Sequence, residues 1–300
     1  MNKHIKRFAG LFLVFSFSIL FFTGCATKKI IPRPTPASVV TTSDYLPSDF
    51  LWQPVAPGIE RFDFENHSIP VIYHAVKIDL NTSDLEIVCF PDSKTKTDSS
   101  GYYFSMKASR FAKKNDCVVA INASPFDGLL SIKKKIIGIH LFNKTEFSPP
   151  ENRYAAIAFT KNQTENGQTY TAHIIKNQPQ NMSENFDFAF GGFYVVLQNE
   201  QVQNSFAQIY DSRSGIGISK DGKTLYFLVV EGERFSKSIG LTYPECAEIF
   251  KAMGCTDALE LDGGGSSELC INGRSILTYK NLRVQANCFG FRFTQSDMNY

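Results

Sequence analysis

Asp262 stands where a run of alternating apolar and acidic residues passes into three consecutive glycines and two serines. Side chains alternate along a strand, so Glu260 and Asp262 are expected on one face of a short strand that ends here. A carboxylate followed by backbone that has no Cβ can hold a ligand against bare N–H groups. The alternative is a tight turn in which Asp262 bonds its own backbone. The amides expected to bind a phosphate or a sugar hydroxyl are those of Gly263, Gly264, Gly265 and Ser266.

Arg213, Arg283 and Asn122 are the other polar residues whose setting indicates chemistry. The guanidinium fork of arginine matches the oxygens of a phosphate, and we predict that Arg213 and Arg283 clamp one. Either arginine could instead pair with a surface carboxylate. Asn122 ends the apolar run that begins at residue 117, and its amide could orient a substrate or cap a buried strand. Two glycines interrupt a later apolar run, which indicates close backbone approach, and we include Gly192 among the substrate-binding residues.

Strand-like runs far outnumber helical ones, which predicts an α+β fold: a strand-rich, mixed or antiparallel sheet with a few packed helices. The Asp-Gly pair at residues 221–222 joins two of these runs and is the strongest hairpin signal in the chain. The runs expected as strands are residues 71–80, 85–90, 117–121, 136–142, 154–160, 188–197, 212–218, 224–230, 268–271, 274–277 and 284–293.

Two helices are predicted, and the second leads directly into the triple-glycine stretch. The first has helical spacing over residues 105–115. The second begins with Thr242 and Glu245, which have the spacing of a capping box, and Gly254 supplies its C-terminal stop. Its apolar face consists of Cys246, Ile249, Phe250 and Met253.

The N-terminal residues have the pattern of an export signal. A charged start is followed by the apolar run 8–22, which is too short for a comfortable membrane span. The run closes on Thr23-Gly24-Cys25, which is similar to a bacterial lipobox except that Phe22 replaces the usual Leu. We therefore predict a signal peptide over residues 1–24 and an exported protein that a lipidated Cys25 tethers to a bacterial envelope membrane. The alternatives are an ordinary cleaved signal and a retained helix.

Composition divides the rest of the chain in two. Residues 25–66 contain a stretch rich in proline, threonine and serine and are predicted to form a spacer and lead-in segment, with the folded domain over 67–297. A net charge of +2 with no basic stripe argues against nucleic acid as a partner. The six cysteines after Cys25 permit disulfides, but no C-x-x-C or H-x-x-x-H spacing occurs. We predict no cofactor and no metal site, and leave metal dependence open.

Taken in order, these motifs resemble those of the phosphodiester glycosidase family. The resemblance runs from about residue 73 to residue 293, and its most specific element is the Leu-Asp-Gly-Gly-Gly-Ser block. There are two departures: Ala123 and Ser124 replace the family's glycines after Asn122, and Glu260 stands where the best-known member has Asn. The other similar segments are Cys117-Val118-Val119-Ala120-Ile121-Asn122, Ser212-Arg213-Ser214-Gly215-Ile216-Gly217, Gly240-Leu241-Thr242 and Leu282-Arg283.

The resemblance implies hydrolysis of a sugar 1-phosphodiester to a sugar and a phosphomonoester. Asp262 would act as the nucleophile or as the base on water, while Arg213 and Arg283 would stabilise the departing phosphate. A phosphomonoester is a better leaving group than a sugar alkoxide, so one carboxylate with a cationic clamp could suffice. The expected partners are a sugar-phosphate or phosphoglycan substrate and the membrane that holds Cys25. The altered loop after Asn122 leaves a second possibility open, a non-catalytic glycan-binding lipoprotein or adhesin on the same fold.

Overall fold

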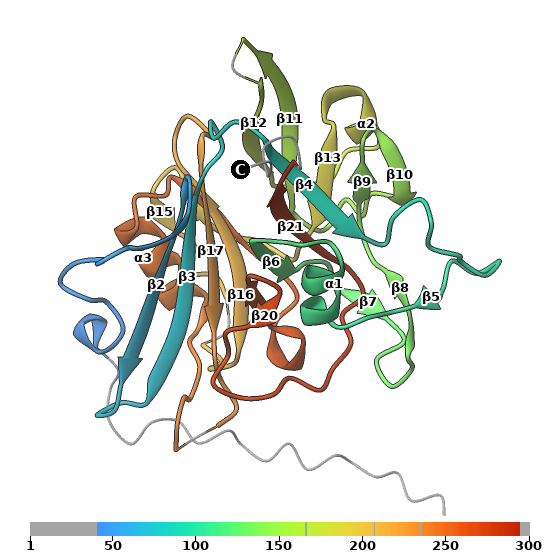
Figure 1. Cartoon of the computed structure of the whole chain (residues 1–300). Coiled ribbons are helices and arrows are strands. Elements are labelled where there is room, and N and C mark those ends of the chain that lie inside the picture. The colour runs from blue at the N-terminus through green and yellow to red at the C-terminus, as the bar shows by residue number, and fades with distance from the viewer. Residues whose placement is uncertain (1–40, 166, 207, 235, 295–300) are drawn as a thin grey trace, which may run out of the picture. The chain divides into compact units, whose positions relative to one another are not determined.

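Alternating apolar runs pair as antiparallel strands throughout the described part of the chain, residues 41–165, 167–206, 208–234 and 236–294 of a computed structural model (Figure 1). Every strand pair recorded there is antiparallel. Strand accounts for 43% of the structure and helix for 11%. The fold is therefore mostly β, and the predicted α+β class fits only roughly, because the strand-like runs pair mainly with one another.

The largest sheet has eight strands in the order β1-β2-β3-β17-β16-β18-β14-β15. Their bounds are Gln53–Ala56 (β1), Ile59–Asn66 (β2), Val71–Asp79 (β3), Thr224–Val230 (β17), Arg213–Ile218 (β16), Asp257–Glu260 (β18), Val195–Gln198 (β14) and Gln201–Val202 (β15). β1 and β2 lie in the segment predicted as spacer and lead-in. Ile59 and Phe62 of β2 are buried, so the domain reaches further toward the N-terminus than residue 67.

Two five-stranded sheets and one small sheet complete the strands. The first has the order β10-β9-β13-β11-β12, the second β20-β19-β6-β21-β4 and the small sheet β5-β8-β7. Their bounds are Thr145–Ser148 (β10), His140–Phe142 (β9), Phe188–Gly191 (β13), Ala156–Thr164 (β11), Gly167–Ile175 (β12), Arg274–Ser275 (β20), Leu269–Ile271 (β19), Val119–Asn122 (β6), Cys288–Phe293 (β21), Leu85–Phe90 (β4), Tyr103–Phe104 (β5), Lys133–Ile136 (β8) and Phe126–Asp127 (β7).

Helix α3 covers one face of the large sheet, as the spacing of its apolar residues predicts. The capping box forms: Glu245 N donates to Thr242 Oγ1 at 3.4 Å, and Thr242 N donates to the Glu245 carboxylate at 2.7 Å. None of the helices among the described residues is long and apolar enough to cross a membrane. The helices are Ala108–Lys114 (α1), Met182–Asn185 (α2) and Tyr243–Ala252 (α3), with 3-10 turns at Thr42–Asp44 (η1) and Gly264–Ser266 (η2).

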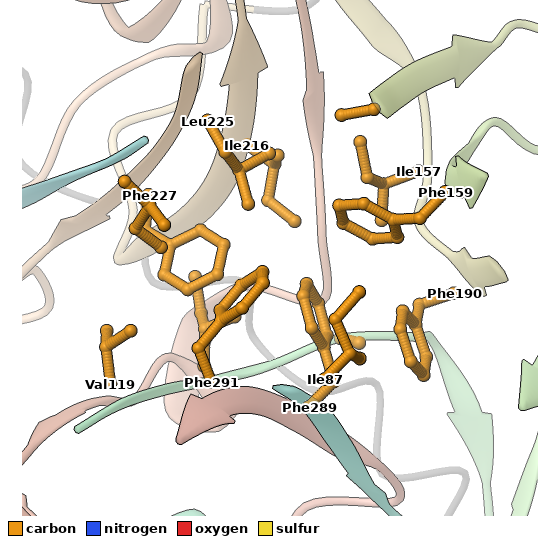
Figure 2. Packing of buried hydrophobic residues seen from close by; sticks show 14 of the residues in the cluster. Ile87, Val119, Ile157, Phe159, Phe190, Ile216, Leu225, Phe227, Phe289 and Phe291 are labelled. Atoms are coloured by element: carbon orange, nitrogen blue, oxygen red, sulfur yellow. The ribbon is translucent and has the colours of Figure 1, made fainter. Parts of the chain in front are cut away.

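The other face of the large sheet packs against the two five-stranded sheets through a core rich in phenylalanine. Figure 2 shows Phe289 and Phe291 of β21 beside Phe227 of β17, and the rings of Phe190 and Phe289 stack with centroids 4.3 Å apart. Burying one such side chain stabilises the fold by about 1.5–3 kcal/mol. This core holds β6, β16 and β18 side by side, and the loops at their ends carry the predicted site.

Two predicted strand runs, residues 136–142 and 188–197, divide between sheets. In the first, Ile136 ends β8, whereas residues 140–142 form β9. Residues 71–80 and 85–90 form β3 and β4, which lie in different sheets rather than in one hairpin. Residues 188–197 break at Gly192 into β13 and β14, again in different sheets. The hairpin of β16 and β17 forms around the Asp-Gly turn as predicted, with Ile218 opposite Leu225.

The predicted signal peptide and lipidation site, residues 1–24 and Cys25, lie outside the described residues. The described residues belong to one unit, Pro36–Tyr300. The disulfides that the even cysteine count permits do not form in it, since all six cysteines after Cys25 are buried free thiols.

Candidate active site

Asp262 follows β18 directly, at the point where two sheets meet. Its backbone N–H donates to the carbonyl of Ala123 at 2.8 Å, and its own carbonyl accepts from the side-chain amide of Asn122 at 2.6 Å. The end of β6 is therefore bonded to the residue that carries the carboxylate. Such bonds fix the backbone of Asp262 and so restrict the directions its side chain can take.

The side chain of Asn122 connects neighbouring strand ends through hydrogen bonds. Its Oδ1 accepts from the Ser214 hydroxyl at 2.8 Å and from the Glu268 N–H at 3.0 Å, while its Nδ2 donates to Asp262. The residue is fully buried among these partners. The sequence indicated that Asn122 orients a substrate or caps the strand. The contacts give it a positioning role, because its side chain holds β16, β19 and the Asp262 backbone together.

The glycines after Asp262 turn the chain back within one 3-10 turn. Gly264 has φ +58°, a conformation that side chains disfavour, and its N–H donates to the Ser212 carbonyl at 2.8 Å. A Cβ on Gly265 would lie 2.8 Å from the Arg283 guanidinium carbon, so only glycine lets that cation rest on the turn.

Two amides of this turn have no recorded acceptor among the described residues. Ser266 and Ser267 donate to carbonyls within the turn, and Gly264 donates to Ser212. The N–H groups of Gly263 and Gly265, both half-buried, make no such bond. They are the amides that remain available for an anion, as the bare backbone predicts.

Arg283 reaches the turn from the loop between β20 and β21. Its Nη1 donates to the Ser266 hydroxyl at 3.4 Å, and its backbone N–H donates to the Asn281 side chain at 2.9 Å. Asn281 in turn donates to the Ser267 carbonyl at 2.9 Å. The half-buried guanidinium is thus held beside Asp262, where the prediction from sequence places one arm of a phosphate clamp.

A buried carboxylate, that of Glu231, binds the loop that carries Arg283 at Thr278. Thr278 donates to Glu231 through both its backbone N–H and its hydroxyl, each at 2.5 Å. Glu231 lies just after β17 and also contacts His74 of β3 at 3.2 Å. Because these partners belong to the large sheet, the position of Arg283 is tied to the main core.

Lys134 of β8 is a site residue that the sequence analysis missed. Its side chain is 1% exposed, and Nζ donates to the carbonyls of Gly128 at 2.8 Å and Leu129 at 3.0 Å. Burial is the largest cause of its lowered pKa, the nearby Arg283 lowers it further, and the Asp262 carboxylate raises it. Three consecutive lysines normally indicate solvated charge, but alternation along β8 buries the middle one.

These neighbours set the charge state of Asp262. Burial raises the pKa of its carboxyl to about 7, while a hydrogen bond from Ser266 and the charges of Arg283 and Lys134 act in the opposite direction. A carboxyl group with this pKa exchanges protons readily near neutral pH, which suits a general base. The site thus combines a titrating acid, two cations and two open amides.

Arg213 lies in a separate cluster on the α3 face of the sheet. Its Nε donates to the Leu241 carbonyl at 2.9 Å, Nη2 donates to the Ile209 carbonyl, and the guanidinium lies 4.2 Å from the centre of the Tyr243 ring. None of the interactions recorded among the described residues joins Arg213 to Asp262. The paired clamp of Arg213 with Arg283 is therefore revised, because β16 directs Arg213 toward the helix.

Glu260 belongs to the same cluster as Arg213. It is 1% exposed, and neither carboxylate oxygen has a hydrogen-bond partner among the described residues. Burial raises its pKa to about 8, against the opposing effects of Arg213 and the Cys246 thiol. Strand alternation predicted Glu260 and Asp262 on one face, but the strand ends at Glu260 and the interactions recorded for the two acids involve different partners.

Gly192 is buried against β18. A Cβ on it would lie 2.4 Å from the Leu259 side chain and 2.7 Å from the Glu260 carbonyl. The close backbone approach that the sequence indicated is present. Gly192 approaches other residues of the protein, so we assign it a packing role beneath the site rather than the predicted role in substrate binding.

The altered loop after Asn122 is accommodated inside the fold. Ala123 and Ser124 are buried. The Ser124 N–H donates to the Asn287 side chain at 2.7 Å, and the Ser124 hydroxyl accepts from it at 2.9 Å. The carbonyl of Ala123 still accepts from Asp262. These replacements leave the support of the carboxylate intact.

A cavity of about 900 Å³ lies elsewhere and is lined by Asp84, Glu86 and Arg292 among others. None of the predicted site residues lines it. No group of three or more His, Cys, Asp or Glu side chains in the described part of the chain could hold a metal ion.

A model of the phosphodiester glycosidase family matches residues 115–292, and the chain belongs to this family. The match includes Asn122, Arg213, Asp262 and Arg283 and confirms the resemblance seen in the motifs. A solved relative is the catalytic domain of zebrafish N-acetylglucosamine-1-phosphodiester α-N-acetylglucosaminidase, auto-inhibited by its pro-peptide. It is 16% identical with a TM-score of 0.57, over 80% of this chain and 85% of that chain.

Two further solved structures share the fold, and one further protein matches part of the sequence. A hypothetical protein from Synechocystis has a TM-score of 0.59 at 15% identity, over 79% of this chain and 62% of that one. A putative exported protein of Burkholderia pseudomallei has a TM-score of 0.55 at 11% identity, over 74% of each chain. The prophage-derived uncharacterized protein YomE of Bacillus subtilis is 41% identical over 64 residues, which is 21% of this chain and 10% of that relative's length.

Proposed function

We propose that this phosphodiester glycosidase hydrolyses the bond between the anomeric carbon of a sugar and a phosphodiester, releasing the sugar and a phosphomonoester. The observation that carries the proposal is the half-buried Asp262 carboxyl, with a pKa of about 7, beside Arg283 and Lys134. A phosphodiester carries one negative charge, which two cations and the open amides of Gly263 and Gly265 complement.

In the simplest reaction Asp262 acts as the base. The oxygen of a water molecule bonds to the anomeric carbon as Asp262 takes its proton, and the bond from that carbon to the phosphate oxygen breaks. The electron pair leaves with the phosphate. Arg283 and Lys134 stabilise the charge that develops there, so a protonated second carboxyl is not required.

A covalent route uses the same residues. An Asp262 oxygen would bond to the anomeric carbon first, and water would displace it in a second step. The two routes differ in stereochemistry: a single displacement inverts the anomeric configuration, whereas two displacements retain it. The configuration of the released sugar therefore identifies the role of Asp262.

We also assign the protein an exported location, with lipidated Cys25 holding it at a bacterial envelope membrane. The support is the apolar run followed by Thr23-Gly24-Cys25 and a proline-rich spacer. A sugar-phosphate or phosphoglycan of the envelope is then the accessible substrate class.

The experiment is to incubate the chain with matched pairs of sugar 1-phosphodiesters and sugar 1-phosphomonoesters. We expect release of free sugar from the diesters, together with a phosphomonoester and no inorganic phosphate. Release of inorganic phosphate from the monoesters, or no reaction with any diester of the panel, contradicts the proposal.

A further inference from the structure

The small sheet carries an unusual concentration of exposed apolar side chains. Four of them, with exposed fractions between 58% and 101%, form what we call the apolar tip: Phe104 of β5 and Leu129, Leu130 and Ile132 of the loop between β7 and β8. They make up half of the large apolar side chains that are exposed in the described part of the chain. Contiguous exposed apolar surface of this kind marks a site of interaction.

Four lysines lie near parts of the apolar tip. Lys133 and Lys135 follow it on β8, and Lys94 and Lys96 line the same hollow as Phe104. The acids of this region have local partners: Lys133 lies 3.3 Å from Asp98, and Asp127 accepts from the Tyr102 hydroxyl at 2.5 Å. Lys94, Lys96 and Lys135 are exposed. Exposed apolar side chains with these lysines nearby match an anionic lipid surface.

The apolar tip is coupled to the candidate active site through one side chain. Lys134 holds the carbonyls of Gly128 and Leu129, which begin the tip loop, and its charge acts on Asp262 and Arg283. A ligand whose phosphate lies at Lys134 and Arg283 therefore has the tip within reach of the group attached to that phosphate. An apolar group there would extend toward the same surface that the tip contacts.

We propose that the apolar tip enters the acyl boundary of an anionic membrane, and that the substrate is a sugar 1-phosphodiester whose phosphate carries a lipid in that membrane. This rests on the proposed function. Water supplies the hydroxyl that replaces phosphate on the anomeric carbon, Asp262 takes its proton, and the lipid phosphomonoester stays in the membrane. The sugar leaves into solvent.

The size of the surface favours lipid over a protein partner. Four side chains of this kind expose on the order of a few hundred Å². A stable protein interface buries about 800 Å² on each partner, which the tip does not provide. Shallow insertion of a loop into a lipid surface needs no such area, because each apolar group that enters the acyl boundary adds to the binding.

A tryptophan reporter tests the contact directly. The chain has one tryptophan, Trp52, so Leu130→Trp in a Trp52→Phe background places a single fluorophore on the tip. Vesicles of phosphatidylcholine and phosphatidylglycerol with brominated acyl chains should shift its emission to the blue and quench it. Added salt, or omission of phosphatidylglycerol, should weaken the effect. Leu51→Trp in the same background is the matched control, since Leu51 is 73% exposed away from the tip, and it should stay unquenched.

A second variant connects the tip to turnover. Leu130→Ser with Ile132→Ser should weaken the tip's contribution to vesicle binding by at least about tenfold. Hydrolysis of a short, soluble sugar 1-phosphodiester should be unchanged, whereas hydrolysis of a lipid-linked diester in the vesicles should fall. Leu51→Ser should change neither rate.

The outcomes separate the proposals. An unquenched Leu130→Trp reporter on the mixed vesicles overturns the docking surface. So does a dimer that the serine variant dissociates without any response to vesicles, because the tip is then a contact between copies. Quenching together with no hydrolysis of either diester refutes the proposed function and keeps the docking surface. Equal turnover of the lipid-linked diester by wild type and serine variant refutes the contribution of the tip to turnover. Hydrolysis of the soluble diester with none of the lipid-linked diester refutes the lipid substrate alone.

Discussion

The carboxyl of Asp262 is an acid whose ionisation the fold opposes. Burial raises its pKa from the ordinary value of 3.8 to about 7. Between these values the unfolded chain has lost the proton and the folded chain keeps it. The free energy of unfolding therefore falls as pH rises from about 4 to about 7, by about 1.4 kcal/mol for each unit by which the pKa is raised. That loss of stability is present in full above pH 7, where the ionised base is needed.

The first prediction is the pH dependence of hydrolysis. Because the base acts in its ionised form, kcat/KM should rise with pH, reach half its maximum near the pKa of about 7 and level off above it. The substrate should have a phosphodiester that stays ionised throughout this range. The pH dependence of the rate then reports the ionisation of the enzyme alone. A rate that is flat from acid to neutral pH would remove Asp262 from the role of base.

The second prediction concerns Lys134. Its positive charge lowers the pKa of Asp262, so Lys134→Met should move the midpoint of the pH profile upward. It should also slow turnover, by about tenfold, because a charge-assisted contact is worth about 1.5–3 kcal/mol. Lys135→Met is the control, since that neighbour is exposed and should leave both midpoint and rate unchanged. Identical profiles for the two variants would place Lys134 outside the site.

At the scale of elements, the turn after β18 places the carboxylate, the cation and the open amides together. Two of its glycines have different reasons to be glycine. A Cβ on Gly265 would meet the Arg283 guanidinium at 2.8 Å, whereas Gly264 has φ +58° and a Cβ there would make only an ordinary contact, with Asp211 Oδ1 at 3.9 Å. Substitutions at these two positions therefore distinguish the effect of moving Arg283 from the effect of backbone strain.

The third prediction uses this pair. Gly265→Ala should displace the flexible Arg283 side chain and lower kcat/KM at least tenfold, with a change in the free energy of unfolding below about 1 kcal/mol. Gly264→Ala should cost about 1 kcal/mol of stability through its left-handed backbone. Urea unfolding and diester hydrolysis measured on both variants give the comparison. Wild-type activity in Gly265→Ala would mean that the position of Arg283 is unimportant.

The elements with strong local signals could be predicted from the sequence. The capping box and apolar face of α3, the Asp-Gly hairpin of β16 and β17, and the strand before Asp262 all follow from nearby residues. The allocation of strands to sheets could not, because β3 and β4 are both apolar and are separated only by the distant strands with which they pair, β17 for β3 and β21 for β4.

The site was predictable to a similar extent. Asp262, its glycines and Arg283 come together, since a specific motif marks them. Arg213, expected at the site, lies buried against Tyr243, whereas Lys134, in a run typical of solvated charge, is buried near Asp262. Which face of a strand is buried depends on the neighbouring sheet, and a run of three lysines gives no local sign of it.

For the whole molecule, the fourth prediction concerns anchoring. Lipid attachment requires the thiol of Cys25. Cys25→Ser should therefore abolish metabolic labelling by fatty acid and release the chain from the membrane fraction. The vesicle contact of the apolar tip alone should be weak and reversible. Labelling that persists unchanged in Cys25→Ser would show that the motif at residues 22–25 is no lipidation site.

We propose that Asp262 is the reacting carboxylate, and the variant Asp262→Asn is the test of this role. Asparagine keeps the shape and the backbone bonds of the turn and removes the ionisable group. Hydrolysis of a sugar 1-phosphodiester should fall by orders of magnitude. Stability at pH 8, measured by thermal unfolding, should stay level or rise, because a buried charge has been removed. An Asp262→Asn protein that is folded and fully active would contradict the account and move the chemistry to another residue.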